Sequence, residues 1–442
     1  MKIAIYEPDP RICGPMMWAW EIRNGLRKNG HEVNVLTSTK SGRPSTMWGG
    51  EQKQSRGVKN WPHKIDHVVK HDHLIDTMDS YDLIIMPDIV NMGQDKETKK
   101  GWSSFRSTTP PTVTPFTLPD GSVDQHEIFD VVPFYIHALQ TTKTRWITGL
   151  HGNLYTEAKV PYLRYLLDAP SNRSRVMYTN SPYSLDSKHP SIRENTWEPI
   201  HLPYSLKIAD EDFVLPPKNT IGMTGRFIFN KGQPSLALAA SMIDPQLTTE
   251  IWGACSAGLG PSPTFVTFEG MINLDPTSRR KRYGNDPEDV TGMGGNIVAS
   301  YTWDFKYSTD QVVRYLGVYS QPTEVTKRLG LHLGLTVANF SGGLVEFASL
   351  EAMDAGSMSM ALPNVARPEY AMSILPATDV WRGVPKQVQD IEQLRFLADQ
   401  VNRYVAVTDE QRLAAALHNR ATVRRLNDPS AIGERIIELA FS

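Results

Sequence analysis

The chain has 442 residues, of which 40% are hydrophobic and 21% charged, and its formal net charge is −2. This length exceeds one ordinary domain and predicts two or three. The near-neutral charge excludes a protein that attracts nucleic acid through a strong global field, so any basic binding surface must be local. The two cysteines, Cys13 and Cys255, lack metal-binding spacing, which indicates a reducing compartment and argues against a disulfide.

Neither a membrane span nor a secretory signal is predicted. No run of about 18 apolar residues occurs. The first apolar run, Ile3 to Ile5, is only three residues long before the tyrosine and acid that follow it. We therefore expect a cytoplasmic protein that makes no membrane contact, and a monomer.

Strand and helix patterns alternate in the first 200 residues. Lys2 to Tyr6 is an apolar run typical of a strand, residues 16–29 have a helical pattern that Asn29-Gly30 ends, and residues 31–37 alternate as a second strand. This βαβ unit implies a parallel sheet. Further buried strands are predicted over residues 82–87, 146–150 and 175–180.

Gly14 lies in the connection between the first predicted strand and the first predicted helix. Ligands of open α/β sheets gather at the carboxyl ends of strands, and a glycine there lets the backbone approach a ligand closely. The alternative is that Gly14 only forms the turn.

A proline-rich polar stretch over residues 200–219 has the composition of a domain linker. The βα pattern then restarts, with strands predicted at 220–225, 249–253 and 312–319, and helices at 233–242 and 324–330. A glycine loop and short helix over 341–356 lead into a strand at 357–362. Helices close the chain over 390–404 and from residue 409 onward. The sequence therefore predicts two similar α/β domains with a cleft between them.

The stretch from Lys40 to Lys64 is basic, irregular and interleaved with tryptophan. Such a loop is typical of one that follows a phosphate backbone, although a solvated surface loop is the alternative. The candidate DNA-binding residues are Lys40, Arg43, Trp48, Lys53, Arg56 and Lys59.

His151 directly follows the buried strand 146–150, which places it at the ligand edge of the sheet. Histidine can donate, accept or carry charge near neutral pH. The alternative is a histidine with a purely structural hydrogen bond.

Arg226 and Lys231 follow a strand-to-loop transition and are bracketed by Gly225 and Gly232. An arginine fork and a lysine point charge can neutralise a diphosphate leaving group without a metal. Basic residues on a surface loop are the alternative.

The Gly342-Gly343 pair directly precedes a predicted helix. At the start of a helix, unpaired N–H groups and the helix dipole favour the binding of phosphate. Glu351 lies about one and a half turns into that helix and could accept both hydroxyls of a ribose. Glu346 lies five residues earlier, roughly 500° away around the axis, so the two carboxylates should touch different parts of a ligand. The alternative is that both acids only complement the helix dipole.

Several common chemistries lack their sequence patterns. The chain has no G-x-x-x-x-G-K-[ST] motif, no G-x-G-x-x-G after the first strand, no H-E-x-x-H or Cys/His metal spacing, and no G-x-S-x-G elbow. The sequence therefore disfavours a P-loop ATPase, a dinucleotide enzyme, a zinc hydrolase and a serine hydrolase.

Gly-Arg-x4-Lys-Gly at 225–232, followed by Leu-Glu-Ala-Met-x-Ala-Gly at 350–356, resembles the retaining GT-B glycosyltransferases. Most of that family carry two glutamates eight residues apart. The spacing here, Glu346-x4-Glu351, is instead similar to the DNA α-glucosyltransferases of T-even phages. Cys13-Gly14, residues 28–33 and Tyr283-Gly284-Asn285 resemble the same enzymes in the same order.

The resemblance implies an α/β chain with the GT-B fold, in which two Rossmann-like domains face each other across a cleft. Residues 1–205 would form the acceptor (DNA) domain, 206–415 the nucleotide-sugar domain, and 416–442 a helix that crosses back. It further implies transfer, with retention, from a UDP-sugar to a 5-hydroxymethylated pyrimidine flipped out of duplex DNA. No cofactor or metal would be needed, and a phage-encoded protein would work in the host cytoplasm.

By the same resemblance, Arg226 and Lys231 grip the diphosphate, Glu351 the ribose, and Glu346 lies by the sugar. His151 matches a catalytic-site histidine, but Gly152 replaces the aspartate that follows it in the phage enzymes, which leaves a protein acid or base open. Two other functions stay open: a lipid, polysaccharide or small-molecule acceptor, and a non-catalytic GT-B-like protein that binds modified DNA. The candidate donor-binding residues are Gly14, Arg226, Lys231, Gly342, Gly343, Leu344, Glu346 and Glu351.

Overall fold

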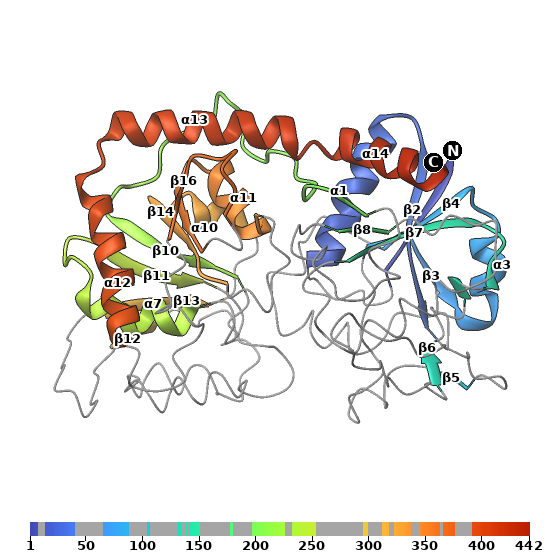
Figure 1. Cartoon of the computed structure of the whole chain (residues 1–442), viewed down its shortest axis with the longest axis horizontal. Helices are drawn as coiled ribbons and strands as arrows, with labels where there is room; N and C mark the ends of the chain where they lie inside the picture. The colour runs from blue at the N-terminus through green and yellow to red at the C-terminus, as the bar shows by residue number, and fades with distance from the viewer. Residues whose placement is uncertain are drawn as a thin grey trace, which may run out of the picture.

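The structure, a computed structural model, has two lobes bridged by the C-terminal helices (Figure 1). It describes residues 1–7, 14–39, 65–87, 104–106, 131–133, 138–139, 141–150, 177–179, 197–225, 232–252, 295–298, 312–317, 322–336, 345–362, 366–375 and 391–442.

The first lobe is built on a seven-stranded parallel sheet with the order β3-β2-β1-β4-β7-β8-β9. Its central strands are buried on both faces, as the apolar runs at Ile3–Ile5 and Leu83–Met86 require. Helix α1 (Gly14–Lys28) connects β1 to β2 and ends before Gly30, whose φ of 88° suits glycine. The strands are β1 (Lys2–Tyr6), β2 (Glu32–Thr39), β3 (His67–Lys70), β4 (Leu83–Met86), β7 (Arg145–Leu150), β8 (Met177–Thr179) and β9 (Trp197–Pro199).

Smaller elements complete the described part of this lobe. A 3-10 turn, η2 (His71–His73), leads into α3 (Leu74–Met78), and β5 (Ser104–Arg106) pairs antiparallel with β6 (Val131–Pro133).

The second lobe repeats the plan with the order β12-β13-β11-β10-β14-β15-β16, in which β12 alone of these strands is antiparallel. The strands are β10 (Thr220–Thr224), β11 (Thr248–Trp252), β12 (Gly295–Val298), β13 (Val312–Gly317), β14 (Leu331–Gly334), β15 (Met358–Ala361) and β16 (Met372–Ile374). The helices are α7 (Gln233–Ala239), η6 (Ala240–Met242), α10 (Pro322–Thr326), α11 (Phe347–Asp354), α12 (Ile391–Asn402) and η9 (Arg403–Ala406).

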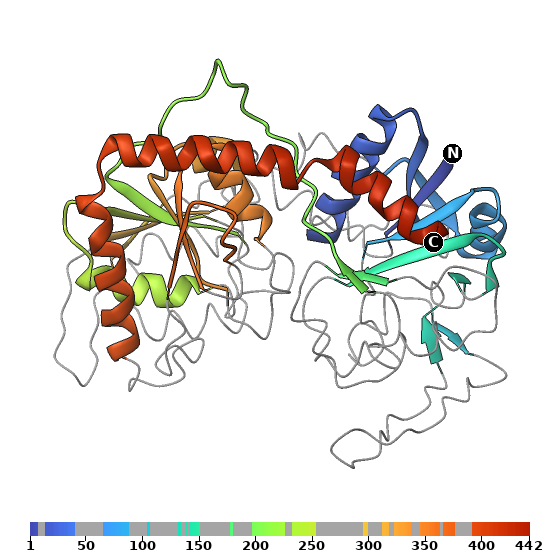
Figure 2. The ribbon, with the colours of Figure 1, turned by 45° about the horizontal axis from the view of Figure 1, so that its top comes forward.

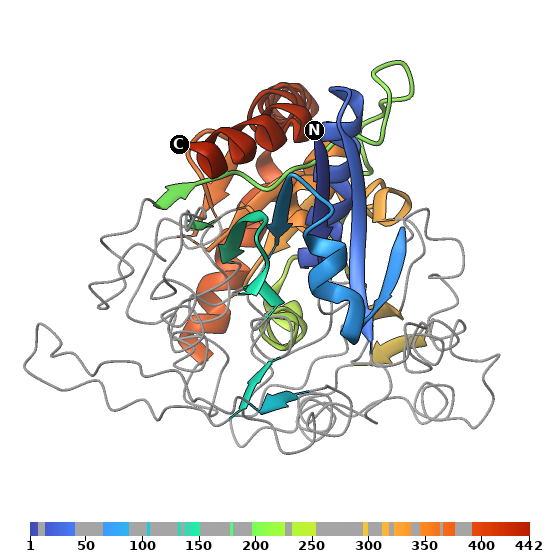
Figure 3. The same cartoon turned by 90° about the vertical axis from the view of Figure 1, so that its right-hand side faces the viewer.

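The last two helices link the lobes. Helix α13 (Asp409–Leu426) starts at a capping box of Thr408 and Gln411 and runs along the second lobe. Helix α13 ends at Leu426, and Asp428 caps the next helix, α14 (Pro429–Phe441), with its side chain. Helix α14 packs on α1 of the first lobe (Figure 2), so both chain ends lie on that lobe (Figure 3).

The predicted limits 206–415 and 416–442 meet inside α13, whereas α14 is the part that reaches the first lobe. The domain limits therefore stay a prediction. None of the helices in the described ranges has the length and hydropathy needed to cross a membrane.

One of the two hydrophobic cores formed by the described residues joins the lobes. It contains Trp18 and Ile22 of α1, Tyr204 of the connecting segment, and Leu350 and Met353 of α11. Helix α11 of the second lobe is thereby held against α1 of the first.

Candidate functional site

The second sheet reverses its strand order between β10 and β14. Such a switch point leaves a crevice at the carboxyl ends of the strands, where ligands of open α/β sheets bind. Gly225 ends β10 with a φ of 132°, and Gly232 precedes α7 with a φ of 79°, both conformations that favour glycine. Gly232 lies so close to Leu335, just after β14, that a Cβ would overlap it. The two glycines that flank residues 226–231 therefore both lie at the switch point.

Glu346 lies at the same point, as the residue that immediately precedes α11. The hydroxyl of Thr336, two residues beyond β14, donates to Glu346 Oε2 at 2.9 Å. A carboxylate is thus fixed between the end of a central strand and the start of a helix, where the helix dipole also favours negative charge.

His332 of β14 is buried in the sheet, near enough to Glu346 for the charge of that carboxylate to act on it. Its Nε2 lies 3.4 Å from Thr224 Oγ1 on β10, and its Nδ1 has no hydrogen-bond partner among the described residues. Burial lowers the pKa of His332 to about 4, although the charge of Glu346 acts in the opposite direction. The imidazole is therefore neutral near pH 7.

Glu351 is buried, with 6% of its surface exposed, on the side of α11 that faces the connecting segment. The pKa of Glu351 is raised to about 8, mainly by burial; the charge of Lys207 opposes this shift, and the charges of Glu21 and Asp354 add to it. Within the described residues the carboxyl group makes no hydrogen bond of its own. A buried carboxyl without partners is costly, so this group is suited to a ligand that brings hydroxyl donors.

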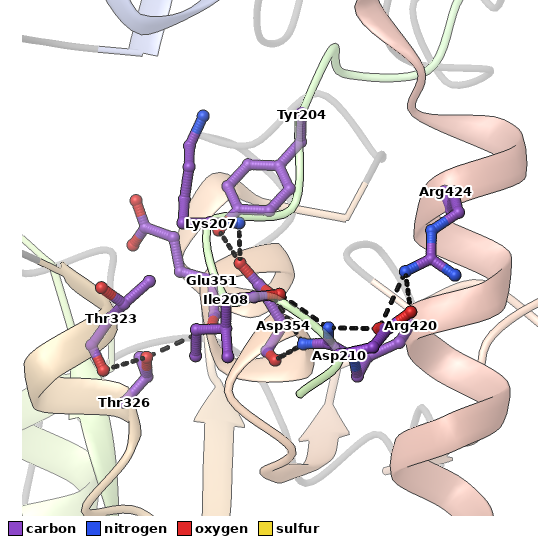
Figure 4. A network of polar contacts seen from close by, with 10 residues as sticks. All are labelled: Tyr204, Lys207, Ile208, Asp210, Thr323, Thr326, Glu351, Asp354, Arg420 and Arg424. Carbon is purple, nitrogen blue, oxygen red and sulfur yellow. Dashed lines mark hydrogen bonds and ion pairs between the residues drawn. The ribbon is translucent and has the colours of Figure 1, made fainter. Parts of the chain in front are cut away.

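A polar network fixes α11 to the segment that connects the lobes (Figure 4). Asp354 accepts from the Tyr204 hydroxyl at 3.0 Å and from the Lys207 backbone N–H at 2.6 Å, and pairs with Arg420 of α13 at 2.9 Å. Arg420 also donates to the Ile208 carbonyl oxygen at 2.7 Å. Burial raises the pKa of Asp354, and these donors act against that shift. The network therefore ties three chain segments together behind Glu351.

Three predicted site residues fall within the described ranges. Gly14 is the first residue of α1, exposed, with open space around it, while Glu346 and Glu351 lie at the start and in the middle of α11. The other predicted residues lie outside the described ranges: His151, Arg226, Lys231, Gly342, Gly343, Leu344, Lys40, Arg43, Trp48, Lys53, Arg56 and Lys59.

Sequence reasoning missed Glu21, Lys207, Thr336, His332 and Asp354. His332 belongs to β14 and Thr336 follows it by two residues. This strand was not predicted because Leu331 to Gly334 is short and contains a histidine. Lys207 and Glu21 are far apart in sequence and meet through tertiary packing alone. No group of three or more metal-ligating side chains is found in the described ranges.

No protein-family model and no curated protein sequence matches the chain. Solved structures do match over the whole chain. An alpha-glucosyltransferase in complex with UDP and a 13-mer DNA containing a HMU base has a TM-score of 0.59 at 13% identity, covering 100% of both chains. Anabaena Alr3699/HepE in complex with UDP has a TM-score of 0.57 at 14% identity, covering 99% of both chains. The same protein with UDP-glucose has a TM-score of 0.56 at 12% identity, covering 99% of this chain and 98% of that one.

These neighbours are GT-B glycosyltransferases, and the chain shares their fold over its full length. The predicted fold of two parallel-sheet α/β domains is confirmed. The neighbours named above were solved with UDP or UDP-glucose bound. At identities of about 13% the likeness establishes the fold and leaves the reaction to be argued from the site.

Proposed function

We propose that the protein is a glycosyltransferase that takes a sugar from a UDP-sugar and binds that donor along α11. The observation that carries the proposal is Glu351, a buried carboxyl with no hydrogen-bond partner of its own in the described chain, on the helix that starts at the β10/β14 switch point. A ribose offers two adjacent hydroxyl donors, the complement that such a carboxylate lacks. Glu346, five residues earlier, then lies by the sugar.

The diphosphate is proposed to bind at this switch point, with residues 226–231 and the Gly342-Gly343 pair as its contacts. The glycine ends of the 226–231 loop lie there, and Arg226 and Lys231 are the charges that this loop would bring. Gly342 and Gly343 precede α11 in the sequence by a few residues, and at the start of a helix the N–H groups and the dipole favour phosphate oxygens. Together they would stabilise the charge on the leaving group without a metal.

The proposed step is front-face displacement with retention. The bond between the anomeric carbon and the β-phosphate oxygen breaks, and a bond to the acceptor hydroxyl oxygen forms on the same face of the sugar. The acceptor proton passes to the departing diphosphate. His151 is proposed to lie in the catalytic site, and Gly152 after it supplies no acid or base.

We propose duplex DNA carrying a 5-hydroxymethylated pyrimidine as the acceptor. Support comes from the Glu346-x4-Glu351 spacing, from the basic stretch of residues 40–64, and from a structural neighbour solved with DNA containing a HMU base. The base would be flipped to reach the donor, with Lys40, Arg43, Trp48, Lys53, Arg56 and Lys59 holding the DNA.

Labelled UDP-sugars incubated with duplexes that differ only in one hydroxymethyl group test the acceptor. We expect label in the hydroxymethylated duplex alone. Label in neither duplex, with UDP released in the presence of a lipid, polysaccharide or small-molecule acceptor, would replace DNA by another acceptor.

Arg226→Ala should abolish UDP release. Unchanged turnover in that variant would contradict the role of Arg226 at the leaving group, and no turnover by the wild type would favour a binding protein.

A further inference from the structure

Lys207 lies in the segment that connects the lobes and touches both of them. Its ammonium forms an ion pair with Glu21 Oε1 of α1, whose side chain is 2% exposed. Its backbone N–H donates to Asp354 of α11, and its ammonium lies 5.3 Å from the centre of the Tyr204 ring. Lys207 is therefore fixed at its backbone and stem, while its charged end lies between α1 and α11.

Glu351 lies near the Lys207 side chain (Figure 4), and the charge of Lys207 acts on its carboxyl group. Among the described residues, the charged or titratable groups that face Glu351 are Glu21 of α1, Lys207 and Tyr204 of the connecting segment, and Asp354 of its own helix. Helix α10 contributes the neutral Thr326, whose hydroxyl donates to the Glu351 carbonyl oxygen at 3.2 Å.

The charges around Glu351 do not balance in pairs. Asp354 is matched by Arg420 of α13, at 2.9 Å. Within the described part of the chain, that pairing leaves Glu21 and Glu351 with a single nearby ammonium, that of Lys207, which forms its ion pair with Glu21. Two buried carboxyl groups close to one cation cannot both be ionised without cost.

We propose that Lys207 is a positioning residue for the donor nucleoside: its ammonium supplies the positive charge that lets Glu351 accept the ribose hydroxyls as a carboxylate, and Glu21 competes for that ammonium. This inference rests on the proposed function, because it takes UDP as the ligand of Glu351. It adds a residue of the first lobe, Glu21, to the determinants of donor binding in the second.

Two substitutions should therefore act in opposite directions. Lys207→Met keeps the side-chain stem over Tyr204 and the backbone bond to Asp354 but removes the cation, so ionisation of Glu351 becomes harder. Glu21→Gln keeps an acceptor for the Ser205 backbone N–H, which now bonds Glu21 Oε2 at 3.2 Å, but removes the competing charge. The pKa of Glu351 should then fall.

Calorimetric titration of the full chain with UDP from pH 6 to pH 9.5 tests this. With the pKa of Glu351 at about 8, the wild-type Kd should fall about tenfold per pH unit below pH 8 and level above it. The pH at which the Kd levels off is called the bend. Lys207→Met should move the bend up by about one pH unit and weaken the binding of UDP about tenfold at pH 7. Glu21→Gln should move it down and tighten UDP at pH 7, while Glu351→Gln should bind weakly with no bend.

Lys218→Met is the matched control, since Lys218 lies in the same segment but donates to the Val405 carbonyl oxygen at 2.8 Å, away from Glu351. It should reproduce the wild-type curve. A bend that stays in place in both variants, or moves the same way in both, overturns the role of Lys207 and leaves the proposed function intact. A wild-type protein that does not bind UDP at any pH overturns both.

Discussion

Glu351 is 6% exposed, and its carboxyl group has no hydrogen-bond partner of its own in the described chain. Ionisation would create a negative charge in a buried place, away from bulk water and without a hydrogen-bond donor from the described residues to stabilise it. For that reason the pKa of Glu351 rises to about 8. Between its ordinary value and pH 8 the folded protein therefore holds a proton that the unfolded chain has lost. The stability contribution of this residue falls as pH rises through that window.

Glu351→Gln removes this titration while keeping the shape of the side chain. We expect its melting temperature, relative to the wild type, to rise between pH 5 and pH 9 by more than about 3 °C, since 1 kcal/mol corresponds to roughly 2–4 °C in domains of this size. Calorimetry across that range measures it. A constant difference between the two proteins would contradict a raised pKa at Glu351.

The hydroxyl of Thr336 fixes the carboxylate of Glu346 at 2.9 Å. Hydrogen bonds to charged groups contribute about 1.5–3 kcal/mol. If Glu346 acts on the sugar during transfer, Thr336→Val should lower kcat by about tenfold or more with a smaller change in KM for the UDP-sugar. Thr336→Ser, which keeps the hydroxyl, should restore most of the rate; equal loss in both variants would indicate a packing role.

At the scale of elements, α1 and α14 approach closely enough that their glycines are in contact with the facing helix. A Cβ on Gly25 would overlap the backbone of Pro429, and one on Gly433 would meet Leu26 at 2.7 Å. Gly25→Ala should cost about 1–3 kcal/mol, because the backbone it meets cannot move aside. Gly14→Ala at the start of α1 meets nothing within 4 Å and should leave the melting temperature unchanged. Equal stability of both variants would contradict this packing.

The network behind α11 gives a second test at this scale. Arg420 is buried and pairs with the buried Asp354, whereas Arg424, 58% exposed, pairs with the exposed Asp210. Arg420→Met leaves Asp354 without its cation and should cost about 3–5 kcal/mol of unfolding free energy. Arg424→Met should change it by less than about 1 kcal/mol. Denaturant unfolding of the two variants measures the difference, and similar losses would mean that burial of Asp354 is not compensated by Arg420.

At the scale of the whole molecule, the alternation of strands and helices in two α/β domains followed from the sequence, while several short strands and the contacts between distant segments did not. Strand β1 and helix α1 were predictable from an apolar run and from the Asn29-Gly30 stop. Strand β14 was not, because four residues that include His332 and Gly334 carry no period. The break at Asp428 was also missed, although its proline at the next position is a typical helix start.

The candidate site divides in the same way. Glu346 and Glu351 were predictable because a glycine loop followed by a helix is a local pattern. The pairing of Lys207 with Glu21 joins residues 186 positions apart, and local patterns say nothing about such contacts. The charge that sets the ionisation of Glu351 could therefore be found only in the folded chain.

The two lobes meet where α11 packs on α1, and the proposed donor site lies on α11. Crystals soaked with UDP-sugars measure this directly. We expect the ribose hydroxyls within hydrogen-bond distance of the Glu351 carboxylate, with the diphosphate between the 226–231 loop and the start of α11. UDP bound elsewhere, or a ribose turned away from Glu351, would contradict the account.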